Sequence, residues 1–304
     1  MTFWLLRLHR WLALLFALPL AAVIVTGLIL SFEPSATIGA ITPRSLDAAR
    51  IETLIAKHDP AGKARALSYR SYDGTLTLGG GRGAPGTTVD LATGERVNGP
   101  GLLSNVFLSS RILHEHLIVG GWLVTASTIA MLVLIGLGLF MGWPRFANSL
   151  SGWHKGAAWI TLPLIILSPL TGLALAFGIT FTSPGPAAAP APATLAEAVR
   201  MLGKDHDLSG LLWMRERRGQ MLARIAEGGE YKLYALTAAG AQPVPRQWPR
   251  LLHEGNWMGH VSAALNVITS LSFVILLATG LWIWTRRQLR RRRNIAARAA
   301  AAGA

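Results

Sequence analysis

Four stretches of this chain contain no Asp, Glu, Lys or Arg, and this feature restricts the possible folds more than any other. They are residues 11–32, 117–144, 156–182 and 261–285. A helix needs about 20 apolar residues to cross a bilayer core, so each stretch is long enough. The first exceeds the apolar region of a signal peptide, about 7–15 residues, and we interpret it as an uncleaved anchor. Only 14% of the residues are charged, against about 25% in soluble domains. The sequence therefore predicts a membrane α-helical protein with four transmembrane helices in a lipid bilayer.

The charged residues outside the spans predict the orientation. If the N-terminus is cytoplasmic, three short segments face the cytoplasm and carry no acidic residue. Their basic residues are Arg7, Arg10, Arg145, Lys155, Arg286, Arg287, Arg290, Arg291, Arg292, Arg293 and Arg298. Cytoplasmic segments of membrane proteins are enriched in Lys and Arg. We therefore expect a bacterial inner-membrane protein with both termini in the cytoplasm and two periplasmic loops. The basic tail is expected to contact anionic lipid, so the net charge of +14 requires no nucleic-acid partner.

Short motifs recur along the chain and predict a tandem repeat. His9 and residues 18–20 and 26–28 match His154 and residues 162–164 and 171–173, residues 111–115 match 250–254, and residues 138–139 match 280–281. Each repeat would hold one span, a loop and a second span, and both copies would begin on the same side of the membrane. Parallel repeats of this kind are related by a pseudo-two-fold axis along the membrane normal.

This interpretation divides the chain into eight segments. They are a first span with the cytoplasmic N-terminus (1–32), a first periplasmic domain (33–110), a second span (111–144), a cytoplasmic loop (145–155), a third span (156–182), a second periplasmic domain (183–250), a fourth span (251–285) and a basic cytoplasmic tail (286–304).

Each periplasmic loop has the pattern of a small α+β domain. In the first loop we expect a helix over 45–58 and strands near 64–71, 75–79 and 87–97, with a turn at 89–94 in the last. In the second loop, Thr194 and Glu197 predict the start of a helix over 194–203, followed by strands near 210–215, 220–226 and 231–237. Residues 79–86 are rich in glycine and predict a loop tip, and residues 183–192 predict a Pro/Ala linker.

The histidines are the residues most suited to chemistry in this chain. Because it has no cysteine, thiolate ligands, disulfides and covalent haem attachment are excluded. We interpret His58 and His206, which are far from any span, as solvated surface residues. Of the six histidines near span ends, four occupy equivalent positions in the two repeats. His9 and His154 lie at the cytoplasmic ends, and His114 and His253 lie at the outer ends.

A two-fold axis along the membrane normal would bring the members of each pair face to face. Two neutral imidazoles can supply both axial ligands of a haem iron, and cofactor sites in helix bundles are commonly built from facing helices. We therefore expect two haem b groups, ligated by His9 and His154 and by His114 and His253. His116 and His260 have no histidine at the equivalent position and are second-tier candidates. The alternative is that all these histidines are polar residues at the membrane surface.

Several motifs together resemble a known family of membrane proteins. Residues 8–11 with 26–28, residues 153–155 with 171–173, and residues 252–259 with 279–284 resemble the helices of PepSY-associated transmembrane proteins, and residues 89–94 resemble the end of a PepSY domain. The resemblance covers nearly the whole chain. The family includes iron-regulated inner-membrane proteins and ferric-siderophore reductases with two b-type haems. It implies the same four histidines, His9, His154, His114 and His253, as haem ligands.

The resemblance implies an oxidoreductase of the ferric-chelate reductase type. Electrons would pass outward to a periplasmic ferric chelate or siderophore in iron acquisition. Because the chain has no fused flavin or nicotinamide domain, the donor would be quinol or a separate cytoplasmic flavoprotein. One alternative is a non-catalytic, membrane-anchored PepSY module for binding or regulation. Another is a siderophore-uptake permease component, which is less favoured because the spans contain no ionisable carboxylate or basic group. The catalytic residues are unknown.

Overall fold

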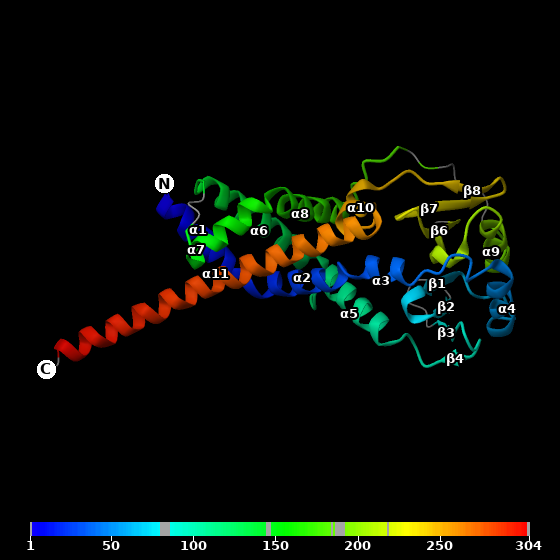
Figure 1. Ribbon diagram of the computed structural model, residues 1–304, viewed down its shortest axis with the longest axis horizontal. Coiled ribbons are helices and arrows are strands. Elements are labelled where there is room, and N and C mark those ends of the chain that lie inside the picture. Colours follow the sequence, from blue (N-terminus) through cyan, green and yellow to red (C-terminus); the bar gives the residue numbers. More distant parts are fainter. Residues whose placement is uncertain are drawn as a thin grey trace. The chain divides into compact units, whose positions relative to one another are not determined.

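The computed structural model describes residues 2–79, 86–143, 147–183, 185, 192–217 and 219–302 (Figure 1). The chain divides into two compact units. The membrane unit comprises Met1–Leu28, Arg111–Gly178 and Leu265–Ala304, and the sheet unit comprises Ile29–Ser110 and Ile179–Ala264. Arg145, most of the glycine-rich segment 79–86 and most of the expected linker 183–192 lie outside the described residues.

The membrane unit is built from helices that are long and apolar enough to cross a bilayer. Three candidate spans are Ala17–Gly39, Gly121–Phe140 and Gly259–Ala301, and a fourth is the bent pair Leu150–Ile160 and Leu162–Ala176 if the two count as one span. The helices are α1 (Thr2–Leu15), α2 (Ala17–Leu30), α6 (Gly121–Phe140), α7 (Leu150–Ile160), α8 (Leu162–Ala176) and α11 (Gly259–Ala302).

The first and third predicted spans are each divided into two helices. Phe16 separates α1 from α2, and Thr161 separates α7 from α8, where the direction changes by 66°. Each interruption lies one or two residues before a Leu-Pro-Leu motif. Pro19 and Pro163 have no N–H for a helical hydrogen bond, and the ring clashes with the preceding turn. A proline is tolerated at the start of a helix, which is where Pro163 lies in α8.

The predicted continuous helices over 111–144 and 251–285 are also interrupted. His114 belongs to α5 (Leu102–His116), which ends before α6, and His253 belongs to α10 (Trp248–Glu254), which ends before α11. Leu117 has a φ of 48° and Gly255 a φ of 66°. A left-handed residue ends a right-handed helix, so each outer histidine lies on a separate helix that precedes a span. At the other end, α11 does not stop at residue 285 and remains helical through the basic tail.

Apolar side chains form the centre of the membrane unit and also cover its outside. Leu20 and Ile24 of α2 pack with Met131 of α6, Ile165 of α8 and Phe273 of α11. Only 11% of the most apolar stretch of α6 is buried within the protein. An apolar surface of this extent is stable where lipid, rather than water, surrounds it.

The sheet unit contains one antiparallel sheet formed by both loops. The strands are β1 (Ala66–Arg70), β2 (Thr75–Gly79), β3 (Thr87–Asp90), β4 (Arg96–Val97), β5 (Leu211–Arg217), β6 (Gln220–Glu227), β7 (Glu230–Thr237) and β8 (Gly240–Pro243). Their order is β4-β3-β2-β1-β5-β6-β7-β8. The first loop joins the second through β1 and β5, where Leu67 lies opposite Met214. The loops therefore do not form two separate sheets.

Two helices, α4 (Ala48–His58) and α9 (Leu195–Gly203), pack together on the sheet (Figure 1). Leu54 of α4 and Leu202 of α9 share a core with Leu76 and Met214 of the strands. The predicted start of α9 is confirmed, because Thr194 Oγ1 accepts a hydrogen bond from Glu197 N at 3.1 Å. The remaining elements are α3 (Glu33–Gly39), η1 (Ser71–Asp73) and η2 (Leu208–Gly210).

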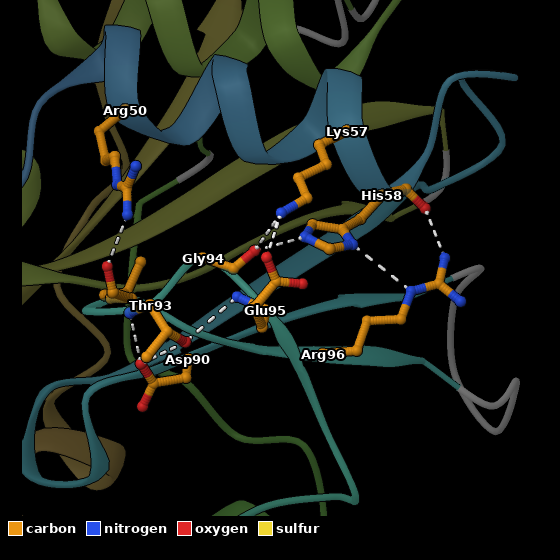
Figure 2. Close-up of polar contacts among 9 residues, drawn as sticks. Arg50, Lys57, His58, Asp90, Thr93, Gly94, Glu95 and Arg96 are labelled. Carbon is orange, nitrogen blue, oxygen red and sulfur yellow. Dashed lines mark hydrogen bonds and ion pairs between the residues drawn. The ribbon is translucent and has the colours of Figure 1, made fainter.

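Polar contacts fasten α4 to the turn between β3 and β4 (Figure 2). His58 Nε2 lies 3.0 Å from Gly94 O, and Lys57 Nζ bonds to Gly94 O at 3.1 Å and to Glu95 Oε1 at 2.7 Å. Asp90 accepts a hydrogen bond from Thr93 N at 2.8 Å and closes the predicted turn. His58 is half-buried, and its ring links a helix to a backbone carbonyl.

Candidate functional site

The first turn of α7 places His154. Ser149 is the N-cap, and its Oγ accepts a hydrogen bond from Gly152 N at 3.1 Å. A Cβ at Gly152 would clash with the carbonyl of Ala147, so only glycine allows this tight start. His154 Nδ1 then lies 2.8 Å from Thr279 Oγ1 of α11.

The hydrogen bonds around Thr279 determine which nitrogen of His154 carries the proton. The Thr279 hydroxyl donates its only proton to Ile275 O at 2.6 Å. Towards the imidazole, the hydroxyl oxygen can therefore act only as a hydrogen-bond acceptor. The same holds for the backbone carbonyl of Leu276, which lies beside the ring. Nδ1 must carry the proton, and the lone pair is left on Nε2. Metal-ligating histidines typically have this arrangement, in which one ring N–H is bonded and the other nitrogen binds the metal.

His114 has the same surroundings on α2. Its Nδ1 lies 3.1 Å from Thr26 Oγ1 and 3.0 Å from Val23 O. The Thr26 hydroxyl donates to Ala22 O at 2.6 Å, so it too can only accept from the ring. A Cβ at Gly27 would approach His114 Cε1 to 3.1 Å. The ring therefore lies directly against the α2 backbone.

These two sites share a structure that we call the Thr-Gly clamp. It consists of a threonine, the carbonyl three residues before it and the glycine after it. The clamps are Val23, Thr26 and Gly27 around His114, and Leu276, Thr279 and Gly280 around His154. Sequence reasoning found the histidines but did not identify the threonines as their hydrogen-bond partners. The signal that identifies the clamp is the recurrence of Thr-Gly-Leu in three of the four spans.

His9 lies near His154 but has no complete clamp. The rings of His9 and His154 are close enough to interact electrostatically. His9 Nδ1 is buried and has no hydrogen-bond partner among the described residues. The backbone of Leu134 on α6 lies near the ring of His9, as that of Leu276 lies near His154. The structure thus brings one of the two predicted histidine pairs together, with different surroundings for its two members.

The comparison with protein families gives a match over most of the chain. The model of the PepSY-associated TM region matches residues 6–287. This chain belongs to the PepSY-associated transmembrane family. The resemblance inferred from the motifs is confirmed, and the match includes all eight histidines. A search of curated proteins found no match.

In this PepSY-associated protein, the helix α10, which carries His253, is held by a polar cluster around Glu254. Glu254, the next residue, bonds to Arg224 Nη2 of β6 at 2.8 Å and to Arg250 Nη1 at 2.7 Å. Asn256 Nδ2 bonds to the same carboxylate at 2.8 Å. These contacts hold the short helix α10 on the sheet. His114 belongs to the membrane unit and His253 to the sheet unit, and their pairing stays a prediction.

The other histidines of the PepSY-associated chain have different surroundings. His116 and His260 are exposed, and the His260 Nδ1 lies 3.3 Å from Ser35 Oγ. His206 was predicted to be a solvated surface residue, which is wrong. Its side chain is 13% exposed, and its Nδ1 lies 3.0 Å from Glu227 Oε1. Within the described ranges, no group of three or more His, Asp or Glu side chains converges as metal ligands.

Proposed function

We propose that this PepSY-associated protein holds two haem b groups and conducts electrons across a bacterial inner membrane. His9 and His154 would ligate the haem near the cytoplasm, and His114 and His253 the haem near the periplasm. The observation that carries the proposal is the Thr-Gly clamp. It occurs around two histidines that are not equivalent in the repeat, and in both it leaves Nε2 as the nitrogen with the lone pair.

The residues present fit a b-type haem. Such a haem needs axial ligands and an apolar enclosure, without covalent attachment. The helices around the clamps supply Leu, Ile, Phe and Met side chains. Gly27 and Gly280 have no side chain, which leaves room for the imidazoles beside the helix backbone. A Cβ at Gly27 would lie 3.1 Å from the ring of His114, and a Cβ at Gly280 would lie 3.5 Å from the ring of His154.

The tasks of the chain follow from these contacts. The clamps orient the imidazoles and fix the ring proton on Nδ1, and the apolar helices exclude water and ions. Haem supplies one-electron transfer when bound. A donor on the cytoplasmic side, quinol or a flavoprotein, gives up one electron, and a ferric chelate or siderophore in the periplasm takes it up, so that Fe³⁺ becomes Fe²⁺. The protein is then a ferric-chelate reductase in iron acquisition.

The tandem repeat supports the placement of the haems. The first and third spans are interrupted one or two residues before Leu-Pro-Leu, and the second and fourth follow short helices that carry His114 and His253. A two-fold axis along the membrane normal would relate the two halves. Both termini would be cytoplasmic, because the short segments carry basic residues only.

A visible spectrum of the detergent-purified protein tests the proposal. We expect a sharp reduced α-band of six-coordinate haem and about two haems per chain. Replacing both His9 and His154 by Ala should reduce the haem content to about one per chain, because the ligands of one haem are removed. Replacing both His114 and His253 by Ala should have the same effect on the other haem.

The control is His260→Ala, which removes an exposed histidine without a clamp and should leave two haems. A colourless protein purified from haem-replete cells would contradict the proposal. The sheet unit would then be the part to examine as a binding or regulatory module. Loss of all haem in the His260→Ala variant would show that the ligands are assigned wrongly.

A further inference from the structure

We propose that the inner histidine pair is unequal, with His154 as the fixed ligand and His9 as the exchangeable ligand. A small neutral molecule that binds ferrous haem would then enter the inner site in place of His9. This inference rests on the proposed haem site, and its test separates the failure of one from the failure of the other.

The first argument is the register of the two helices that face these histidines. Leu134, Leu137 and Gly138 of α6 correspond to Leu276, Thr279 and Gly280 of α11, each at an offset of 142 residues. The contacts follow the same register, because the backbone of Leu134 approaches His9 as that of Leu276 approaches His154. The two sites differ where Leu137 replaces the threonine. This substitution removes the hydroxyl that bonds Nδ1.

The second argument is the space around the rings. A Cβ at Gly280 would lie 3.5 Å from His154 Cε1, so that ring packs against α11. A Cβ at Gly138 would meet no atom within 4 Å among the described residues. The ring of His9 therefore does not lie against α6 at the equivalent point. It lacks both the hydrogen bond and the packing that hold His154.

These differences determine the strength of each imidazole as a ligand. A bonded Nδ1–H fixes the ring and raises the basicity of Nε2. His154 has this support from a hydroxyl at 2.8 Å, whereas the buried Nδ1 of His9 has no partner in the described part of the chain. His9 is consequently the weaker donor and the ring with more freedom to rotate away.

Carbon monoxide binding to the dithionite-reduced, full-length protein in detergent tests the inference. We expect carbon monoxide to change the spectrum of one of the two haems. Leu137→Thr restores the missing hydroxyl and should lower the fraction of haem that binds carbon monoxide several-fold. It should also shift the reduction potential of the inner haem downward, because a more basic ligand stabilises the ferric state.

Two further variants test the hydrogen bond that holds His154, the fixed ligand. Thr279→Val should allow carbon monoxide to bind more completely, and Thr279→Ser should restore the behaviour of the unchanged protein. Thr285→Val is the matched control. Thr285 is on the same helix and donates to Leu281 O at 2.9 Å, and its removal should have no effect. Of the single variants, His9→Ala should retain more haem than His154→Ala.

The results distinguish the two proposals. A protein without haem contradicts the proposed function itself. Two results would contradict the unequal ligands while the protein still holds about two haems per chain. In one, neither haem binds carbon monoxide. In the other, the Leu137→Thr variant binds carbon monoxide as fully as the unchanged protein.

Discussion

Gly27 determines how closely the ring of His114 approaches α2. Two hydrogen bonds that His114 Nδ1 donates, at 3.0 and 3.1 Å, depend on this approach. Both acceptors, Val23 O and Thr26 Oγ1, belong to the same turn of helix and cannot follow the ring if it is displaced. Glycine is tolerated in the helix here because the missing side chain leaves room for the imidazole.

We predict that Gly27→Ala weakens the Thr-Gly clamp around His114. A Cβ would lie 3.1 Å from His114 Cε1, so the ring must move by a few tenths of an ångström, at a cost of about 1–3 kcal/mol. The measurements are the thermal unfolding temperature and the reduced α-band of the haem proposed at His114. Gly136→Ala is the control, because a Cβ there meets no described atom within 4 Å. Equal losses in both variants would contradict the clamp.

Glu227 connects several polar groups of the sheet unit. It bonds to His206 Nδ1 at 3.0 Å, Lys232 Nζ at 3.2 Å and Tyr234 Oη at 2.9 Å. Partial burial raises the pKa of the Glu227 carboxyl, but the hydrogen bonds from His206, Tyr234 and Lys232 outweigh this effect and hold the pKa below its usual value of 4.5.

This pKa shift predicts a loss of stability in acid. A carboxyl whose pKa is lower in the folded state stabilises the fold above its unfolded pKa, and the contribution disappears as the pH falls through the folded pKa. The unfolding temperature of the sheet unit should therefore fall as the pH drops below the usual carboxyl value of 4.5. Glu227→Gln should flatten this part of the pH profile, and the exposed Glu216→Gln should not. Parallel pH profiles for both variants would contradict the role of Glu227.

At the scale of elements, β1 joins the two halves of the sheet. Ser68 of β1 lies opposite Thr77 of β2 and Trp213 of β5. The backbone at this residue therefore has a neighbouring strand on each side. A change that removes its N–H affects the interior of the sheet rather than an edge.

We predict that Ser68→Pro destabilises the sheet unit by about 1–3 kcal/mol, because it leaves a ladder acceptor without its donor. Hydrogen exchange of β1 and β5 measures the effect, which should extend to both strands. Ser68→Thr keeps the N–H and adds a β-branched side chain, so its sheet should remain as protected as the original. Protection retained in the Pro variant would show that β1 is not the joining strand.

The sequence predicted most strands and helices of the sheet unit because their periodicity is local. β2 was predicted with its observed limits, and β6 and β7 were predicted within one residue of their observed limits. The Gly-Ala-Gln-Pro strand β8 has no such periodicity and was missed. The pairing of β1 with β5 could not be predicted, since backbone hydrogen bonds between residues about 147 positions apart leave no local pattern.

The candidate site was predictable only in part. Repetition identified His9, His114, His154 and His253, because it depends on sequence alone. The clamp partners Thr26 and Thr279 depend on the rotation of one helix against another, which spacing does not determine. The contacts of His58 and His206 were missed for a related reason, because their partners are a backbone carbonyl in the turn after β3 and a carboxylate on β6.

At the scale of the whole molecule, α11 is longer than any membrane requires. Its 44 residues span about 66 Å at 1.5 Å per residue, twice the bilayer core of about 30 Å. The excess carries the arginine run at residues 286–293. In a helix these side chains point in all directions around the axis, and long basic side chains near a membrane contact anionic headgroups. The arginine run is therefore a rigid extension of the span rather than a loose tail.

The shared sheet has a consequence for how a gene of this kind can change. Each loop alone would expose one long edge, at β1 or at β5, and an exposed edge recruits strands from other chains. In the full sheet β1 and β5 pair with each other, so neither is an edge, and the outermost strands are the short β4 and β8. A deletion that removed either half would leave a product inclined to aggregate. Both halves must therefore be inherited together, however far their sequences drift apart.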